Sequence, residues 1–125
     1  MLLKDKLYQI TASEKTEDTS SYTLRISDTF PLLKGHFPGS PVLPGVCILQ
    51  IFKELAETDL AIENPIAYSE IKQCKFLQPI AMNNPIEVVA CLSLKQDGAV
   101  WNLSTSLKND ATIFTTLKAV LTTKQ

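Results

Sequence analysis

His36, the one histidine of the sequence, lies just ahead of an apolar stretch that is typical of a buried helix. An imidazole is the side chain best matched to proton transfer near neutral pH. Three prolines follow it closely and stiffen the segment, so that the ring can be held in place: Pro38, Pro41 and Pro44. These residues indicate a loop that presents His36 as a general base.

The start of the apolar stretch offers a second chemical group, a pair of backbone amides. The pattern predicts a helix over residues 44–57, since proline suits a first helical turn and apolar residues almost encircle the segment. The first amides of a helix have no intrahelical acceptor. Those of Gly45 and Val46 can therefore donate to a carbonyl oxygen or an anion, helped by the helix dipole. Such a pair could polarise a thioester carbonyl.

The polar side chains of this helix form one stripe, because their spacing is i, i+3, i+4 and i+7. The stripe consists of Gln50, Lys53, Glu54 and Glu57. Gln50 lies nearest to the apolar start of the helix, where the amides are. We expect the three charged residues to form the exposed end of the helix.

Strands that could cover this helix are predicted by alternating apolar and polar residues. In the first half, residues 7–12 and 22–26 have strand character, and the polar residues 13–21 indicate a turn. Residues 28–44 hold so many prolines and glycines that they predict a structured loop. The second half predicts four strands, over residues 68–77, 86–94, 100–107 and 112–122, with turns at Asp97-Gly98 and at residues 108–110. The whole chain, residues 1–125, is thus expected to form one α+β domain.

Composition excludes several classes of function. The formal net charge of -1 and the pI near 5.8 argue against nucleic acid or an anionic membrane as the main partner. Cys47, Cys74 and Cys91 lie far apart, which gives no support to a metal site or a disulfide framework, and we expect reduced core residues. No apolar run has the length of a signal peptide or a membrane span. We therefore expect a cytoplasmic protein without a metal or other cofactor.

The segment from Gly35 to Val46 reads Gly-His-Phe-Pro-Gly-Ser-Pro-Val-Leu-Pro-Gly-Val. It closely resembles the signature of the (3R)-hydroxyacyl-acyl carrier protein dehydratases, the FabZ/FabA-like family. The likeness continues through the segment Lys-Phe-Leu-Gln-Pro-Ile at residues 75–80 and the hairpin that holds Trp101. The resemblance implies a hot-dog fold, in which an antiparallel sheet wraps around one long buried helix. It also implies a homodimer or higher oligomer with an acyl tunnel at the interface, and acyl carrier protein bearing a 3-hydroxyacyl chain as partner.

The resemblance assigns roles to single residues. His36 matches the family's catalytic histidine, which takes the C2 proton of the substrate. The amides of Gly45 and Val46 match the donors that face the thioester carbonyl. Phe37 and Gly39, in the same loop as His36, are further candidates for substrate binding.

The sequence departs from the family at Gln50. The family has Glu or Asp there, contributed by the opposite protomer, and this acid protonates the leaving hydroxyl. A carboxamide can bind the hydroxyl but cannot be that acid, and losing general acid catalysis costs roughly 10²- to 10⁴-fold in rate. Glu54 occupies the position where many of these dehydratases have glutamine, so the two groups look exchanged. Glu54 is an alternative candidate for the acid, although one helical turn moves a carboxylate by about 5 to 6 Å.

The function that we expect is elimination of water from a 3-hydroxyacyl thioester of acyl carrier protein, in fatty acid or related acyl-chain synthesis. The first alternative is a catalytically impaired subunit that pairs with an active paralogue as a heterodimer. The second alternative is an acyl-thioester-binding protein or a thioesterase, since the same tunnel and carbonyl donors suit other thioester chemistry.

Overall fold

The structure is a computed structural model that describes residues 2–31, 41–62 and 64–123. Its elements are one six-stranded sheet and one long helix. In chain order they are β1 (Tyr8–Lys15), β2 (Ser20–Ile26), α2 (Gly45–Leu60), β3 (Ile66–Phe76), β4 (Ile86–Asp97), β5 (Val100–Asn109) and β6 (Thr112–Thr123).

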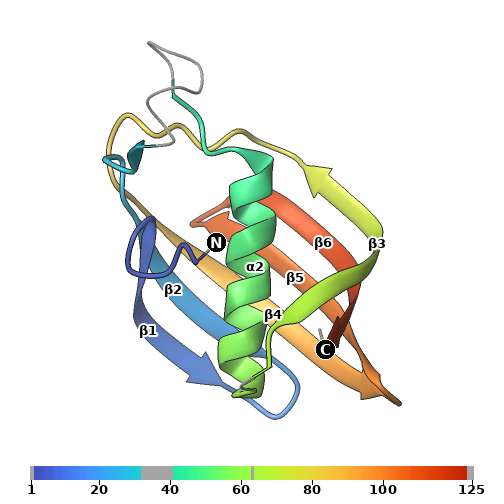
Figure 1. The fold of residues 1–125 in the computed structure, drawn as a ribbon. Coiled ribbons are helices and arrows are strands. Elements are labelled where there is room, and N and C mark those ends of the chain that lie inside the picture. The colour runs from blue at the N-terminus through green and yellow to red at the C-terminus, as the bar shows by residue number, and fades with distance from the viewer. Residues whose placement is uncertain (1, 32–40, 63, 124–125) are drawn as a thin grey trace.

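The strands follow the order β1-β2-β4-β5-β6-β3 across the sheet, and every neighbouring pair is antiparallel. The helix α2 runs across one face of the sheet, and the strands curve around it (Figure 1). An antiparallel sheet wrapped around one helix is the hot-dog architecture, so the predicted α+β fold is confirmed.

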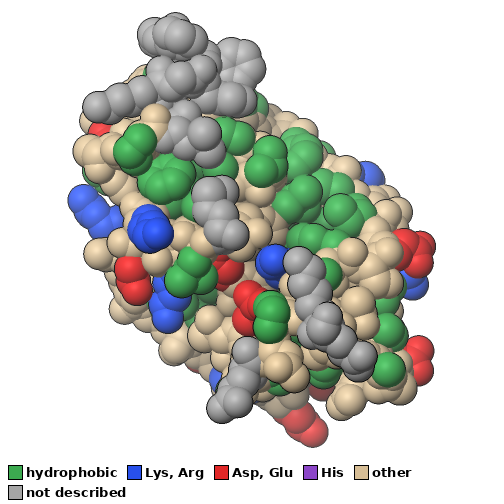
Figure 2. All heavy atoms as spheres, in the orientation of Figure 1, with side chains coloured by type: hydrophobic (Ala, Val, Ile, Leu, Met, Phe, Trp, Pro, Cys, Tyr) green, Lys and Arg blue, Asp and Glu red, His purple; other side chains and the backbone are tan. Residues whose placement is uncertain are grey.

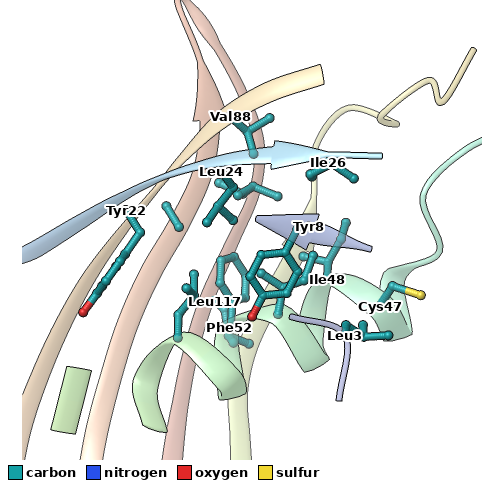
Figure 3. Packing of buried hydrophobic residues seen from close by; sticks show 14 of the residues in the cluster. Leu3, Tyr8, Tyr22, Leu24, Ile26, Cys47, Ile48, Phe52, Val88 and Leu117 are labelled. Atoms are coloured by element: carbon teal, nitrogen blue, oxygen red, sulfur yellow. The ribbon is translucent and has the colours of Figure 1, made fainter. Parts of the chain in front are cut away.

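The apolar side of α2 forms the centre of the core. Its buried apolar residues are Cys47, Ile48, Ile51, Phe52, Leu55 and Ala56. They belong to one cluster with buried residues of the sheet, among them Leu24 of β2, Val88 of β4 and Leu117 of β6 (Figure 3). The driving force that holds the helix against the sheet is therefore burial of apolar surface.

The helix begins where the sequence predicts and continues past residue 57 to Leu60. One of the residues beyond 57, Asp59, makes a tertiary contact. The hydroxyl of Tyr22 on β2 donates to its carboxylate at 2.8 Å. The helix ends at Ala61, which adopts a left-handed conformation with φ 52° and donates its N–H to the carbonyl of Thr58.

The turn predicted over residues 13–21 was wrong, because both strands extend into it. β1 continues to Lys15 and β2 begins at Ser20, so the turn is confined to residues 16–19. The side chains from residue 11 to residue 15 are all exposed, and a strand without a buried face shows no alternation in its sequence. The turn at Gly98, with φ 63°, is confirmed.

The prediction of three core cysteines is confirmed for Cys47, which is buried, and in part for Cys74, which is half-buried and packs against the core. Cys91 is half-buried and does not belong to that cluster. Cys91 lies between the inward-facing Ala90 and Leu92, and its side chain therefore belongs to the opposite face of the sheet. Burial raises the pKa of the Cys47 and Cys74 thiols, which disfavours the reactive thiolate.

Two buried threonines of the sheet differ in hydrogen bonding and provide a test of the core. Thr105 Oγ1 donates to the carbonyl of Cys91 at 2.8 Å, whereas Thr115 Oγ1 has no partner in the described part of the chain. We expect Thr105→Val to lower the free energy of unfolding by about 0.5 to 1.5 kcal/mol, and Thr115→Val to leave it unchanged or raise it. Urea denaturation measures both. Equal losses in the two variants would contradict this assignment.

Candidate active site

The structure places four of the predicted site residues on one helix. Gly45 and Val46 form the first turn of α2, and Gln50 and Glu54 follow on its polar stripe. His36, Phe37 and Gly39 lie outside the residues that the structure describes, and their roles stay predictions.

A short antiparallel bridge fixes the chain that leads into α2. Leu43 donates its N–H to the carbonyl of Ile80 at 2.9 Å, and Met82 donates to the carbonyl of Pro41 at 2.8 Å. Pro44 then adopts an extended conformation, with φ -62° and ψ 143°, and the helix begins. The start of α2 is thereby tied to the connection between β3 and β4.

The first turn of α2 presents two backbone donors. The N–H groups of Cys47 and Ile48 donate to the carbonyl of Pro44, at 3.0 and 3.2 Å. Within the described residues, neither Gly45 nor Val46 donates its N–H, and the first turn carries no acidic side chain and no side-chain cap. Their two amides at the positive end of the helix dipole suit a partly negative oxygen, such as a polarised carbonyl.

Exposed apolar side chains lie near these amides. Val46, Phe76 and Leu77 expose 66%, 54% and 49% of their surface, and Figure 2 shows hydrophobic side chains gathered near the start of α2. A Cβ atom at Gly45 would lie only 2.8 Å from Cζ of Phe76, so glycine allows the ring to approach the helix start. The surroundings of the two donors therefore suit a ligand with an apolar chain.

Glu54 is buried, with 3% exposure, and the prediction that it belongs to an exposed helix end was wrong. The N-terminal segment lies against this face of α2 and binds both carboxylate oxygens. The N–H of Leu3 donates to Oε2 at 2.8 Å and that of Lys4 to Oε1 at 2.9 Å. The hydroxyl of Tyr8 donates to Oε1 at 2.9 Å, and Figure 3 shows it turned toward α2.

Gln50 is half-buried and supplies the fourth donor to Glu54, from Nε2 to Oε2 at 2.7 Å. Each oxygen of Glu54 thus accepts two hydrogen bonds, which is the pattern that an ionised carboxylate satisfies. Burial, followed by the neighbouring Glu54, raises the pKa of Tyr8 far above its usual range, so Tyr8 keeps its proton and donates.

Sequence reasoning missed the contribution of the N-terminal segment to this cluster. Leu3, Leu7 and Tyr8 are almost fully buried, at 0%, 0% and 1% exposure. In the sequence, three charged residues separate Leu3 from Leu7 and Tyr8. That pattern could have indicated a single turn with one apolar side. Asp5, at φ 65°, lies in that turn.

Other kinds of site find no support in the described residues. They include no group of three or more His, Cys, Asp or Glu that could hold a metal ion. Within the same ranges, no helix is long and apolar enough to cross a bilayer.

Together the curved antiparallel sheet and the single long helix packed against it define a hot-dog protein. The family model of the ApeI-like proteins, described as ApeI dehydratase, matches residues 12–115, and the chain belongs to that family.

Curated relatives agree with the family assignment. The chain is 24% identical over 131 residues to the 3-hydroxyacyl-[acyl-carrier-protein] dehydratase FabZ of Geobacter metallireducens, a match that covers 98% of this chain and 85% of the relative. It is 30% identical over 80 residues to FabZ of Nitratidesulfovibrio vulgaris, covering 58% of this chain and 51% of the relative. In that match the chain spans about half the length of its relative.

Solved structures share the fold. The dehydratase heterocomplex ApeI:P from Xenorhabdus doucetiae matches with a TM-score of 0.72 at 21% identity, covering 91% of this chain and 96% of that chain. An uncharacterized protein from Erwinia carotovora matches with a TM-score of 0.64 at 27% identity, covering 93% of this chain and 92% of that chain. At 21% identity the likeness to the heterocomplex establishes the fold alone.

The buried contact between Tyr8 and Glu54 can be tested against a second tyrosine. Tyr8→Phe removes a hydrogen bond to a charged acceptor, and we expect it to lower the free energy of unfolding by about 1.5 to 3 kcal/mol. Tyr68→Phe is the matched control, because its hydroxyl donates at 2.6 Å to the neutral carbonyl of Leu49, and we expect a loss of about 0.5 to 1.5 kcal/mol. Urea denaturation of both variants measures the difference. A smaller loss for Tyr8→Phe than for Tyr68→Phe would contradict an ionised Glu54.

Proposed function

We propose that this chain binds a 3-hydroxyacyl thioester of acyl carrier protein and eliminates water from it, in fatty acid or related acyl-chain synthesis. The observation that carries the proposal is the pair of amides at Gly45 and Val46, next to the apolar surface of Phe76. The names of the FabZ relatives support a substrate bound to a carrier protein.

In the proposed reaction His36 takes the proton from C2 of the substrate. The electrons of that C–H bond move toward the thioester carbonyl, and the amides of Gly45 and Val46 stabilise the negative charge that develops on its oxygen. The bond between C3 and the hydroxyl oxygen then breaks, a double bond forms between C2 and C3, and the hydroxyl leaves as water once it gains a proton. The elimination leaves the overall oxidation state unchanged, and we propose no cofactor.

The proposed site has no identified group that protonates the leaving hydroxyl. Gln50 carries no proton to give, and we infer that Glu54 is not the acid, because four donors already occupy its two oxygens. Without a positioned acid the rate falls by roughly 10²- to 10⁴-fold. We therefore propose that the chain alone is a slow dehydratase.

His36→Ala tests the base. We expect it to abolish the hydration of crotonyl thioesters and the dehydration of 3-hydroxybutyryl thioesters, because the described residues near the helix start include no base that acts at neutral pH. The assay uses thioesters of both carrier protein and coenzyme A, with circular dichroism as the check of folding. Retained turnover in a folded variant removes His36 from the chemistry, and release of free acid instead of enoyl product would indicate a thioesterase.

A second candidate function is that of a subunit that pairs with an active paralogue. The four donors that bind Glu54 favour this function, since the chain then needs an acid from a second subunit. β3 lies at one edge of the sheet and pairs with β6 on its inner side, and its outer edge suits strand pairing with a second protomer. In such a pair the paralogue's acid would complete the site of His36. The ApeI:P heterocomplex gives a precedent within the same fold.

Gln50→Glu tests both candidates. The introduced carboxyl would lie against Glu54, and a like charge raises its pKa and keeps it protonated, as an acid requires. We expect dehydration by the chain alone to rise by about 10-fold or more. Sedimentation shows whether the variant assembles like the native chain. If it does, and activity rises only when a paralogue is added, the pairing subunit is the correct function.

A further inference from the structure

The face of the sheet that is turned away from α2 is hollowed across β4, β5 and β6. Figure 1 shows α2 on the other face. Two adjoining hollows, of about 460 and 310 Å³, share Ser93, Ser104 and Lys118 in their linings. Each of the three alternates along its strand with residues that point to the core, as Lys118 does with Leu117 and Ala119. We call the two hollows together the outer groove.

Three lysines line the outer groove, and among the described residues no acidic side chain does. They are Lys72, Lys95 and Lys118, and all three are exposed. Two hollows elsewhere in the described chain contain carboxylates beside their cations. The ion pair present in the described residues joins Lys15 to Asp59, so the three lysines of the groove have no carboxylate partner there. The groove is thus a concentration of positive charge on a chain whose formal net charge is -1.

The three lysines are spaced across the strands in the way that charges are spaced along one side of a helix. Lys118 of β6 pairs with Gln73 of β3, directly after Lys72. Lys95 lies on β4, beyond β5 and two residues along, so its Cα lies roughly 12 Å from that of Lys118 at the usual strand spacing and rise. Glu70, two residues before Lys72, does not line the groove. Because side chains on one side of a helix recur about every 5 to 6 Å, a helix laid across the strands can place one carboxylate near each lysine.

The outer groove is continuous, along β3 and β6, with the apolar surface at the start of α2. Thr116 lines the larger hollow and pairs with Lys75 of β3. The next pair, Phe76 and Thr115, belongs to the α2 side of the sheet, where the ring of Phe76 lies close to Gly45. A partner on the outer face can therefore pass an attached acyl chain around the end of β3 to the amides at the helix start.

We propose that the outer groove is the docking surface for the carrier protein, with an acidic helix of that protein lying across β3, β6, β5 and β4. The choice of partner rests on the proposed function. Carboxylates of the helix pair with the three lysines, and the short side chains of Ser93 and Ser104 let the helix approach the sheet. A second copy of this chain, bound face to face, would instead bring the lysines of both copies together, and like charges repel. Exposed ion pairs of this kind act mainly on the rate of association and on the choice of partner, and salt weakens them.

Kinetics with two forms of one substrate test the docking surface. The groove variant Lys72→Gln/Lys95→Gln/Lys118→Gln should raise KM for 3-hydroxybutyryl carrier protein by about 5-fold or more, as the loss of three exposed ion pairs would. Its kcat should stay unchanged. Turnover of 3-hydroxybutyryl N-acetylcysteamine, an uncharged thioester without a carrier, should not change either. A groove variant that folds, by circular dichroism, and keeps the native KM for the carrier-protein substrate overturns the proposal.

A second triple variant is matched to the first in charge. Lys6→Gln/Lys15→Gln/Arg25→Gln removes three exposed cations that do not line the outer groove. We expect native kinetics with both substrates, because the charges that we assign to docking remain in place. An equal rise of KM in the two variants would mean that only the net charge matters, and it overturns a defined docking surface.

Direct binding separates failure of the docking surface from failure of the proposed function. In titration calorimetry, carrier protein of the same organism without an acyl group should bind the native chain, more weakly at high salt, and bind the groove variant at least about 5-fold more weakly. A chain that binds this carrier protein through the three lysines but turns over no thioester contradicts the proposed function and supports the docking surface. A chain that turns over the uncharged thioester but does not bind the carrier protein overturns the docking surface alone. If sedimentation shows that the groove variant changes the oligomeric state while carrier binding persists, the face is a contact between copies and the proposal is overturned.

Discussion

A carboxylate inside a protein is tolerated only where donors replace the water that it loses. Glu54 meets that constraint at the boundary between α2 and the N-terminal segment, where backbone donors of Leu3 and Lys4 supplement the side chains of Tyr8 and Gln50. The apolar side of α2 needs only a matching apolar surface, which many packings provide. The charge on its other side needs donors at defined points, and it therefore fixes the course of the N-terminal segment over the helix.

The same constraint links the core to the chemistry at the start of α2. Pro44 and Gly45 determine where the helix begins and which amides are left over, while the bridge between Leu43 and Ile80 fixes that point against the rest of the chain. Gln50 lies between this start and the buried charge. Gln50 Nε2 donates to Glu54 Oε2, so that hydrogen bond connects the polar stripe of the helix to the buried charge.

Much of the fold could be predicted from the sequence, because β4, β5 and β6 each have one buried face. Alternation over residues 86–94 and the Asp97-Gly98 turn locate the β4–β5 hairpin, and the proline and glycine before Val46 locate the helix start. The burial of Glu54 could not be predicted. Local periodicity groups it with Lys53 and Glu57, and what buries it is a segment that lies some fifty residues earlier in the chain. The extent of β1 escaped prediction as well, since its exposed residues leave no pattern to detect.

The strand order also has a consequence for the way in which the protein folds. The β4–β5 and β5–β6 hairpins close over short turns, with Asp97 opposite Val100 and Asn109 opposite Thr112. β3 instead pairs with β6, which places Ile66 opposite Thr123. In the sequence, both β4 and β5 lie between these two paired strands. Closing such a long loop costs more chain entropy than closing a hairpin, so we expect the meander to form first and β3 to dock onto it later. Since the ring of Phe76 at the end of β3 lies close to Gly45, we expect the apolar surface at the helix start to be completed only after β3 has docked.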